Sequence, residues 1–279
     1  MSKWTPSNTT TYYWINGQNV TLTGKGVLSA VTDLSGNSRG LSLGAAATRP
    51  TIASADVNGY DVFEFNGTSQ YLESDDASEF NFESSDFAVF CMVKRTGAAG
   101  NPIQTVYDMG GALSDGYAQY FVFVDGVTDQ CYCSTGGSAQ VTTSATDVYR
   151  VTSLYDNSAT SSAKIDGSLM GVGGTPDTSY TASEPFTIGT TDPDGGSPYF
   201  LEGKVAEIIV VQGTLSDREI EQFEGYLRVK YALTNFTGGR FRDAGPAVGL
   251  VGNHNNDTSG EISLDISGSI ASDGPTVAI

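Results

Sequence analysis

The sequence predicts an all-β protein, an antiparallel sandwich or barrel with one α-helix on its C-terminal side at about residues 216–231. Most of the chain consists of short runs rich in Val, Thr, Phe and Tyr that end at Gly, Asn-Gly or Asp-Gly, as in strands joined by tight turns. Only residues 201–233 combine helical periodicity with a helix start signal. The 279 residues could form one large domain or two small ones, and the lack of a linker between residues 57 and 233 favours one.

The candidate strands share a β-rich composition and a boundary at a turn signal. They are Val62–Phe65, Phe87–Lys94, Tyr120–Val124, Tyr149–Tyr155, Ala163–Ile165 and Phe186–Ile188. Phe63 and Phe65 fall on one face of their strand. Asn66-Gly67 and Asp166-Gly167 are dipeptides that tolerate positive φ, so each predicts a tight turn.

The segment Leu201–Leu233 predicts a buried strand followed at once by a helix. Val205–Val211 is apolar except for Glu207 and does not alternate, which predicts a strand covered on both faces. Ser216 and Glu219 have the spacing of a capping box, which places the helix start at Ser216. We expect Glu207, the one carboxylate of the strand, to be structural rather than catalytic.

The helix has an apolar stripe and a polar face. Residues at helical spacing predict the packed stripe, and Leu215 with Ile220 forms a candidate hydrophobic staple. The packed positions are Ile220, Phe223, Leu227 and Tyr231; the positions expected in solvent are Arg218, Glu221, Glu224 and Lys230.

Composition excludes two classes of partner. Hydrophobic residues make up 39% of the chain, yet its apolar runs are far shorter than the roughly 20 residues of a membrane helix. The formal net charge of -18 repels the nucleic-acid backbone.

The N-terminal residues contain no apolar core of a signal peptide, so we expect synthesis in a cytoplasm without secretion by a signal peptide.

The cysteines predict structural thiols. Cys91 lies in an apolar run, and Cys131 and Cys133 are two residues apart, on one face of a predicted strand. Zinc needs additional thiolate or imidazole ligands, and the one histidine, His254, lies far along the chain. We therefore expect that the protein requires no cofactor.

Several motifs follow one another in order from about Trp4 to Leu233. They are Asp33-Leu34-Ser35-Gly36-Asn37, Arg49-Pro50-Thr51, Phe63–Thr68 with Tyr71-Leu72, Phe87–Lys94, Lys164–Gly167, Phe186–Gly189 and Leu201–Leu233. In this order they resemble the concanavalin A-like lectin/glucanase superfamily, the laminin-G-like jelly rolls, in the variant found in tailed-phage virion proteins. The resemblance implies a concanavalin A-like β-sandwich with a jelly-roll topology.

The resemblance leaves three functions open. The first is a structural protein on the virion surface, a head decoration or a tail or fibre component, with capsid or tail proteins and copies of itself as partners. The second is a lectin-like adhesion module for host polysaccharide. The third is a glycoside hydrolase, but hydrolases of this superfamily carry paired carboxylates in an E-x-D-x-x-E strand motif, which this sequence lacks. We therefore expect no enzymatic activity.

Three groups of residues are candidates for binding. Tyr117, Tyr180 and Tyr199 lie near predicted turns and are candidates for stacking on sugar rings. Asp192 and Asp194 offer oxygen ligands in a loop where the resemblance implies calcium. The candidate assembly contacts are Trp4, Tyr12, Tyr13, Trp14, Ile262, Leu264 and Ile266.

These contacts accompany a predicted division into three parts. Residues 1–20 form an N-terminal arm, residues 21–233 the sandwich, and residues 234–279 a C-terminal extension. Both tryptophans of the chain lie in the N-terminal arm.

Overall fold

The computed structural model describes residues 4–80, 82, 85–96, 103–109, 120–124, 128–133, 137–142, 147–156, 161–172, 185–191 and 199–234. The chain divides into two units, Thr5–Gly239 and a second one of Met1–Trp4 with Arg240–Ile279. Of the second unit only Trp4 is described.

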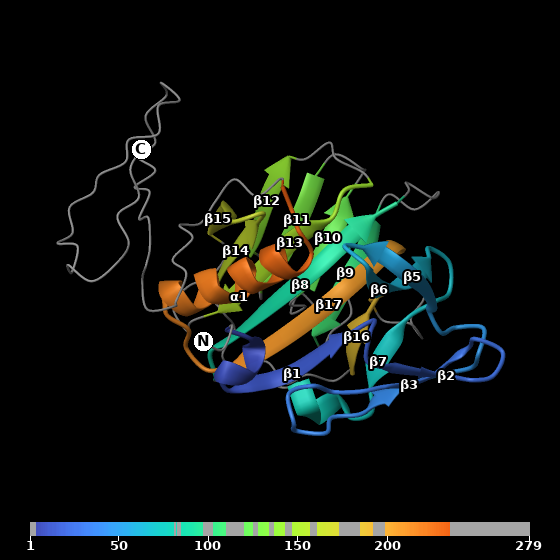
Figure 1. The fold of residues 1–279 in the computed structure, drawn as a ribbon. Coiled ribbons are helices and arrows are strands. Elements are labelled where there is room, and N and C mark those ends of the chain that lie inside the picture. Colours follow the sequence, from blue (N-terminus) through green and yellow to red (C-terminus); the bar gives the residue numbers. More distant parts are fainter. Residues whose placement is uncertain are drawn as a thin grey trace, which may run out of the picture. The chain divides into compact units, whose positions relative to one another are not determined.

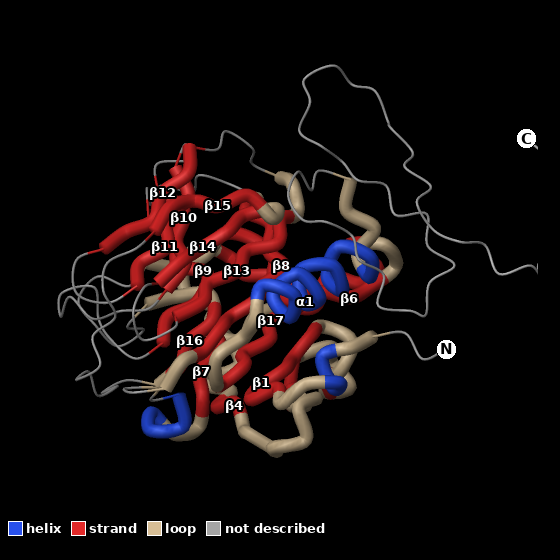
Figure 2. Tube along the Cα trace, turned by 90° about the vertical axis from the view of Figure 1, so that its left-hand side faces the viewer, coloured by secondary structure: helices blue, strands red, loops and turns tan. Residues whose placement is uncertain are grey.

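Within the described residues, two large antiparallel sheets form the layers of a sandwich (Figures 1 and 2). The first sheet has the order β15 (Ser168–Val172), β14 (Ser161–Ile165), β13 (Arg150–Asp156), β8 (Phe87–Arg95), β17 (Glu202–Gln212), β6 (Tyr60–Asn66) and β5 (Thr51–Val57), with β1 (Thr11–Asn16) paired to β17. The second has the order β12 (Gly137–Thr142), β11 (Thr128–Cys133), β10 (Tyr120–Val124), β9 (Ile103–Met109), β16 (Phe186–Ile188), β7 (Leu72–Ser74) and β4 (Leu41–Ser42). The predicted all-β sandwich is confirmed.

Smaller elements complete the unit. β2 (Val20–Leu22) and β3 (Leu28–Val31) form a separate hairpin. Two short 3-10 helices, η1 (Pro6–Asn8) and η2 (Ala77–Phe80), and the α-helix α1 (Asp217–Lys230) are the helices of the described residues. None of these helices is both long and apolar enough to cross a membrane.

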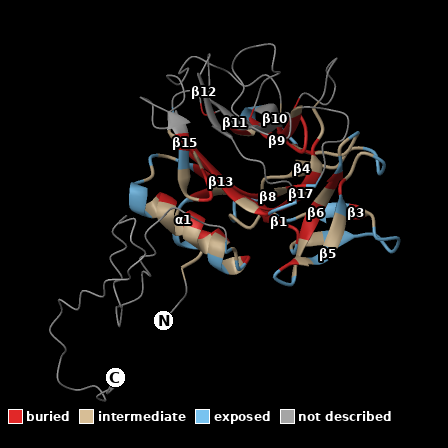
Figure 3. Ribbon diagram, turned by 90° about the horizontal axis from the view of Figure 1, so that it is seen from above, coloured by how far each residue is buried: buried red, intermediate tan, exposed pale blue. Residues whose placement is uncertain are grey.

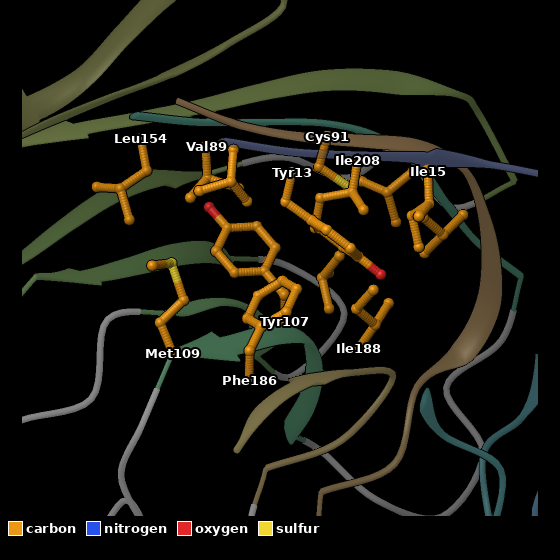
Figure 4. Close-up of a cluster of buried hydrophobic side chains, with 14 of the residues drawn as sticks. Tyr13, Ile15, Val89, Cys91, Tyr107, Met109, Leu154, Phe186, Ile188 and Ile208 are labelled. Atoms are coloured by element: carbon orange, nitrogen blue, oxygen red, sulfur yellow. The ribbon is translucent and has the colours of Figure 1, made fainter. Parts of the chain in front are cut away.

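The hydrophobic core lies between the facing surfaces of the two sheets (Figure 4). It contains Val89, Cys91, Leu154 and Ile208 of the first sheet and Tyr107, Met109, Phe186 and Ile188 of the second. Figure 3 shows the buried residues gathered in the strands of these layers. Cys91 is a buried core thiol, as predicted, and Cys131 and Cys133 lie in β11.

β17 is the central strand of the first sheet. One of its edges pairs with β8, from Gly203 to Gln212. Its other edge is shared, because Glu202–Val205 pair with β6 and Glu207–Val211 pair with β1. The strand is buried on both faces, which confirms the prediction from an apolar run that does not alternate.

The predicted N-terminal arm is partly wrong, because residues 11–16 form β1 inside the first sheet. Tyr13 and Ile15 are fully buried in the core. The pairing partner of β1 lies nearly two hundred residues away, and a bulge between Thr11 and Tyr13 interrupts the local alternation. Because of these two features, local sequence patterns do not predict the strand.

The motif Asp33–Asn37 covers the outer edge of β1. The Asp33 carboxylate accepts hydrogen bonds from the backbone N–H groups of Trp14 at 3.1 Å and Ser35 at 2.9 Å. The Asn37 amide donates to the carbonyls of Thr11 at 3.1 Å and Tyr12 at 2.9 Å. The loop thereby satisfies backbone groups that an edge strand would otherwise expose.

Two predicted turns have the expected backbone. Gly67 has φ +72°. Asp166 and Gly167 have φ 50° and 78°, the pair of positive values that joins β14 to β15 by a two-residue turn. The Asp166 side chain also accepts a hydrogen bond from the backbone of Val151 at 3.1 Å, so this turn is tied to β13.

α1 lies across the outer face of the first sheet, over β8 and β13 (Figures 1 and 2). Ser216 is its N-cap, and the Glu219 carboxylate accepts from the Ser216 backbone at 2.8 Å, so the predicted capping box is confirmed. The predicted packed stripe of α1 is buried, and the Phe223 ring stacks on Phe90 with centroids 4.5 Å apart.

The predicted solvent position of Lys230 is wrong, because its side chain is only 11% exposed and its ammonium donates to the buried Glu207 carboxylate. The predicted solvent position of Glu224 is wrong as well. Its side chain is 2% exposed, accepts a hydrogen bond from the Ser153 hydroxyl at 2.6 Å and lies 4.0 Å from the Lys164 ammonium. Burial raises its pKa. A polar position of a helix can be buried where the sheet below offers a hydroxyl and a cation, and helical periodicity does not reveal those partners.

Candidate functional site

Most predicted binding residues fall outside the described part of the chain. Tyr117, Tyr180, Asp192, Asp194, Ile262, Leu264 and Ile266 all belong to this group. One glycan candidate, Tyr199, lies in the described part of the chain. The described assembly candidates are Trp4, Tyr12, Tyr13 and Trp14.

Tyr199 belongs to a group of half-buried aromatic residues, the aromatic rim, made of Tyr71, Tyr199 and Phe200. Tyr71 directly precedes β7, and one residue separates Phe200 from the start of β17. The ring centroids of Tyr71 and Phe200 are 6.5 Å apart. The Thr105 N–H of β9 donates to the Tyr199 carbonyl at 3.0 Å. Strands of both sheets therefore position the rim, whose three residues are half-buried.

Sequence reasoning found Tyr199 but missed its two neighbours. Tyr71 lies in one of the recognised motifs, and Phe200 is adjacent to Tyr199 in the chain. The contact between Tyr71 and Phe200 joins positions more than a hundred residues apart. No local pattern reports such a contact.

A polar centre surrounds Glu207 beneath the C-terminal half of α1. Its carboxylate is fully buried and accepts hydrogen bonds from the Trp14 indole, from the hydroxyls of Tyr226 at 3.0 Å and Tyr231 at 2.8 Å, and from the Lys230 ammonium at 2.7 Å. Burial, followed by the charge of Glu207, raises the pKa of both tyrosines, which stay protonated donors. Four donors saturate the two oxygens, so this carboxylate is not available as a nucleophile or a general base.

A second polar cluster lies on the same outer face. Lys94 and Lys204 flank the core-facing Val93 and Val205, so they point away from the core. Asp56 accepts from Lys204 at 2.5 Å and from the Tyr149 hydroxyl at 2.5 Å. Burial alone would raise the pKa of Asp56, but these hydrogen bonds outweigh it and lower the pKa.

Charges within this second cluster are mutually compensated. Lys204 also lies 3.4 Å from Glu64, and Lys94 lies 3.7 Å from Asp56. Burial lowers the pKa of Lys204, but the hydrogen bond that its ammonium donates to Asp56 helps to raise that pKa above its usual value, so the ammonium stays charged. The arrangement resembles a structural ion network more than a catalytic pair.

Asp108 is a buried carboxylate of the second sheet that sequence reasoning missed. It accepts a hydrogen bond from the Thr191 hydroxyl, and Thr191 is the last described residue before Asp192. The available signal was that Asp108 is the one charged residue of β9. Among the described residues, no three His, Cys, Asp or Glu side chains gather closely enough to hold a metal ion.

The N-terminal aromatic residues pack within their own unit. Tyr13 contacts Phe80 and Phe186 edge-on and is fully buried, so it is not available to another chain. Tyr12 is half-buried under the Arg39 guanidinium, which lies 3.5 Å from the ring centroid. Trp14 is half-buried at the Glu207 centre. The prediction of Tyr13 as an assembly contact is therefore wrong, because its ring is part of the core.

No family model matches the chain, and no curated protein sequence is similar to it. Solved structures share its fold. The fold they share is the antiparallel β-sandwich described above. The binding domain of Paraclostridial Mosquitocidal Protein 1 is 12% identical with a TM-score of 0.54, over 78% of this chain and 52% of that one.

Two other structures show the same likeness. A Trypanosoma rangeli sialidase in complex with sialic acid is 13% identical with a TM-score of 0.57, over 80% of this chain and 33% of that one. The Botulinum neurotoxin serotype G binding domain is 9% identical with a TM-score of 0.54, over 82% of this chain and 54% of that one. This chain thus spans about a third to about half of each neighbour, and the likeness concerns the fold alone.

Proposed function

We propose that this chain is a non-catalytic, lectin-like module of a tailed-phage virion, exposed on the particle as a head decoration or as part of the tail or fibre. The observation that carries the non-catalytic part is the saturation of Glu207 in β17 by four donors from β1, α1 and the C-cap of α1. The lectin-like sandwich supports a binding or display role. The ordered motifs of the sequence support the virion setting.

Glycoside hydrolysis receives little support from the described carboxylates. A retaining hydrolase needs two carboxyl groups about 5–5.5 Å apart, one of them free to attack the sugar. Glu207 is saturated, and Asp56 and Glu64 are both paired with Lys204. Each of these carboxylates has an intramolecular role that catalysis would disrupt.

The virion proposal implies synthesis in the host cytoplasm and assembly with capsid or tail proteins and with further copies of this chain. Reconstruction of particles produced from the genome that encodes this chain tests it. Density of this fold on the capsid lattice or on the tail is the expected result. Particles that lack the chain by mass spectrometry would exclude the virion role.

A second candidate, adhesion to host polysaccharide, is favoured by the aromatic rim. Aromatic side chains that are half-buried and held by strands of both sheets can stack on sugar rings with little loss of side-chain entropy. We expect Tyr199→Ala and Tyr71→Ala each to weaken binding on a glycan array. Tyr155→Ala, which changes a half-buried tyrosine of β13, is the matched control.

The outcomes separate the two candidates. Binding that falls in both rim variants and persists in the control supports adhesion through the rim. Binding that all three variants retain contradicts the rim as the site. A folded wild-type chain that binds no glycan leaves display on the virion as its function.

Calcium is not required by this proposal. Asp192 and Asp194 are its candidate ligands, because carboxylates are the oxygen donors that calcium prefers. Isothermal titration of calcium into the wild-type chain and into Asp192→Asn/Asp194→Asn tests them. Equal heats in the two proteins would exclude these residues as ligands.

A further inference from the structure

The ammonium group of Lys230 lies inside a group of aromatic side chains and one carboxylate. Its Nζ is 5.1 Å from the ring centroid of Tyr60, 5.5 Å from that of Tyr226 and 5.1 Å from that of Tyr231. The same atom is 2.7 Å from Glu207 Oε2 and 3.2 Å from the Tyr226 hydroxyl. The Lys230 side chain is only 11% exposed, and that of Glu207 is fully buried. The cation is thus largely removed from water.

The surrounding residues come from four separate segments. Trp14 belongs to β1, Tyr60 begins β6, Glu207 lies in β17, and Tyr226 and Tyr231 come from α1 and its C-cap. We call these five residues the ammonium cage. Since their positions span more than two hundred residues, the cage exists only in the folded chain.

The cage is held rigid by contacts among its own members. Trp14 and Tyr226 meet edge-to-face with centroids 6.2 Å apart, and Tyr60 and Tyr231 do so at 5.3 Å. Trp14 and Tyr226 donate to Oε1 of Glu207, while Tyr231 and Lys230 donate to Oε2. Ring faces and carboxylate are therefore oriented before any cation enters.

This combination is the chemistry that recognises alkylammonium ions. Aromatic faces attract a cation through their quadrupoles, most strongly when water is excluded. A buried carboxylate adds a charge-assisted hydrogen bond with the N–H groups of a primary ammonium. A planar guanidinium is wider and would not present a point charge to the rings in the same way.

We propose that Trp14, Tyr60, Glu207, Tyr226 and Tyr231 form a binding site for a primary alkylammonium ion, which the chain fills with its own Lys230. The occupied site holds the last turn of α1 against β17 and β6. The Asn58 side chain reinforces this by donating to the Lys230 carbonyl at 2.7 Å. Removal of the Lys230 side chain leaves a site that accepts a small alkylammonium ion from solution.

Chemical rescue of Lys230→Ala by n-butylammonium tests the site. In a Trp4→Phe background, Trp14 is the one remaining tryptophan and lies in the cage, so its fluorescence reports occupancy. We expect a saturable change in the Lys230→Ala protein with butylammonium chloride, at ionic strength matched with sodium chloride. The response should be at least about tenfold weaker in the protein that retains Lys230. It should be weaker by the same factor in the double variant Lys230→Ala/Glu207→Gln. Butanol should give no saturable change.

A folded Lys230→Ala protein without a saturable response, or an equal response in all three proteins, would overturn the proposal. Lys230→Met provides a second route, because methionine keeps an unbranched stem and removes the charge. We expect it to lower the urea midpoint, whereas Lys25→Met, at an exposed lysine, should not. A Lys230→Met midpoint equal to that of the wild type would also overturn the proposal.

Discussion

Truncation of Phe223 to alanine removes the ring that joins α1 to the first sheet. Phe223 is fully buried, and its ring is nearly parallel to that of Phe90, with an interplanar angle of 13°. Loss of a buried phenylalanine costs about 3–5 kcal/mol, which includes about 0.5–1.5 kcal/mol for the lost ring pair. Alanine is the better helix former by about 0.5 kcal/mol, so we expect a net loss of roughly 3–4 kcal/mol.

Urea unfolding followed by circular dichroism measures this loss. The midpoint should fall while the dependence on denaturant stays constant, because the surface exposed on unfolding hardly changes. The thermal midpoint should fall by about 6–16 °C for a domain of this size. Val229→Ala is the control on the same helix, at a side chain that is 41% exposed. A loss below about 1 kcal/mol, no larger than the control's, would refute the packing of α1 described above.

Three other substitutions test the pH dependence, the helix start and a turn. Burial raises the pKa of Asp166 from 3.8 to about 6. The folded state therefore binds this proton at a higher pH than the unfolded state does. As the pH falls from about 7 to about 4, the free energy of unfolding of the wild type should rise by roughly 2–3 kcal/mol relative to that of Asp166→Asn. A difference between the two proteins that stays constant in urea unfolding across that range would contradict this prediction. Ser216→Ala removes the N-cap and should cost about 1 kcal/mol in the same assay, and no change would argue against the capping box. Gly67→Ala should lower the free energy of unfolding by more than about 1 kcal/mol, because the position has φ +72° and the added Cβ would lie 2.8 Å from the Glu202 side chain. The control Gly24→Ala, where nothing lies within 4 Å of the added Cβ, should be nearly neutral.

Features of the fold that arise between neighbouring residues were predictable from the sequence. The turn at Gly67, the turn at Asp166 and the capping box of Ser216 each depend on a few consecutive residues, and all three are confirmed. The non-alternating apolar run of β17 also predicted its burial on both faces. Each of these signals reflects a local backbone preference or the local polarity of the chain.

Long-range partners were not predictable. β1 was expected in an arm, because its strand partner β17 lies at the other end of the domain. Glu224 was expected in solvent, because the Ser153 hydroxyl and the Lys164 ammonium that accompany it belong to other strands. The aromatic rim was found only in part for the same reason.

The sequence by itself determined an all-β sandwich with one capped helix, and it indicated that Glu207, isolated in an apolar strand, is structural. Only the tertiary structure decided what that carboxylate does. It brings Trp14 from the first strand and Tyr226, Lys230 and Tyr231 from the last helix onto two oxygen atoms. A buried charge is tolerated only with such partners, and their proximity depends on the closure of the whole domain rather than on any pattern along the chain.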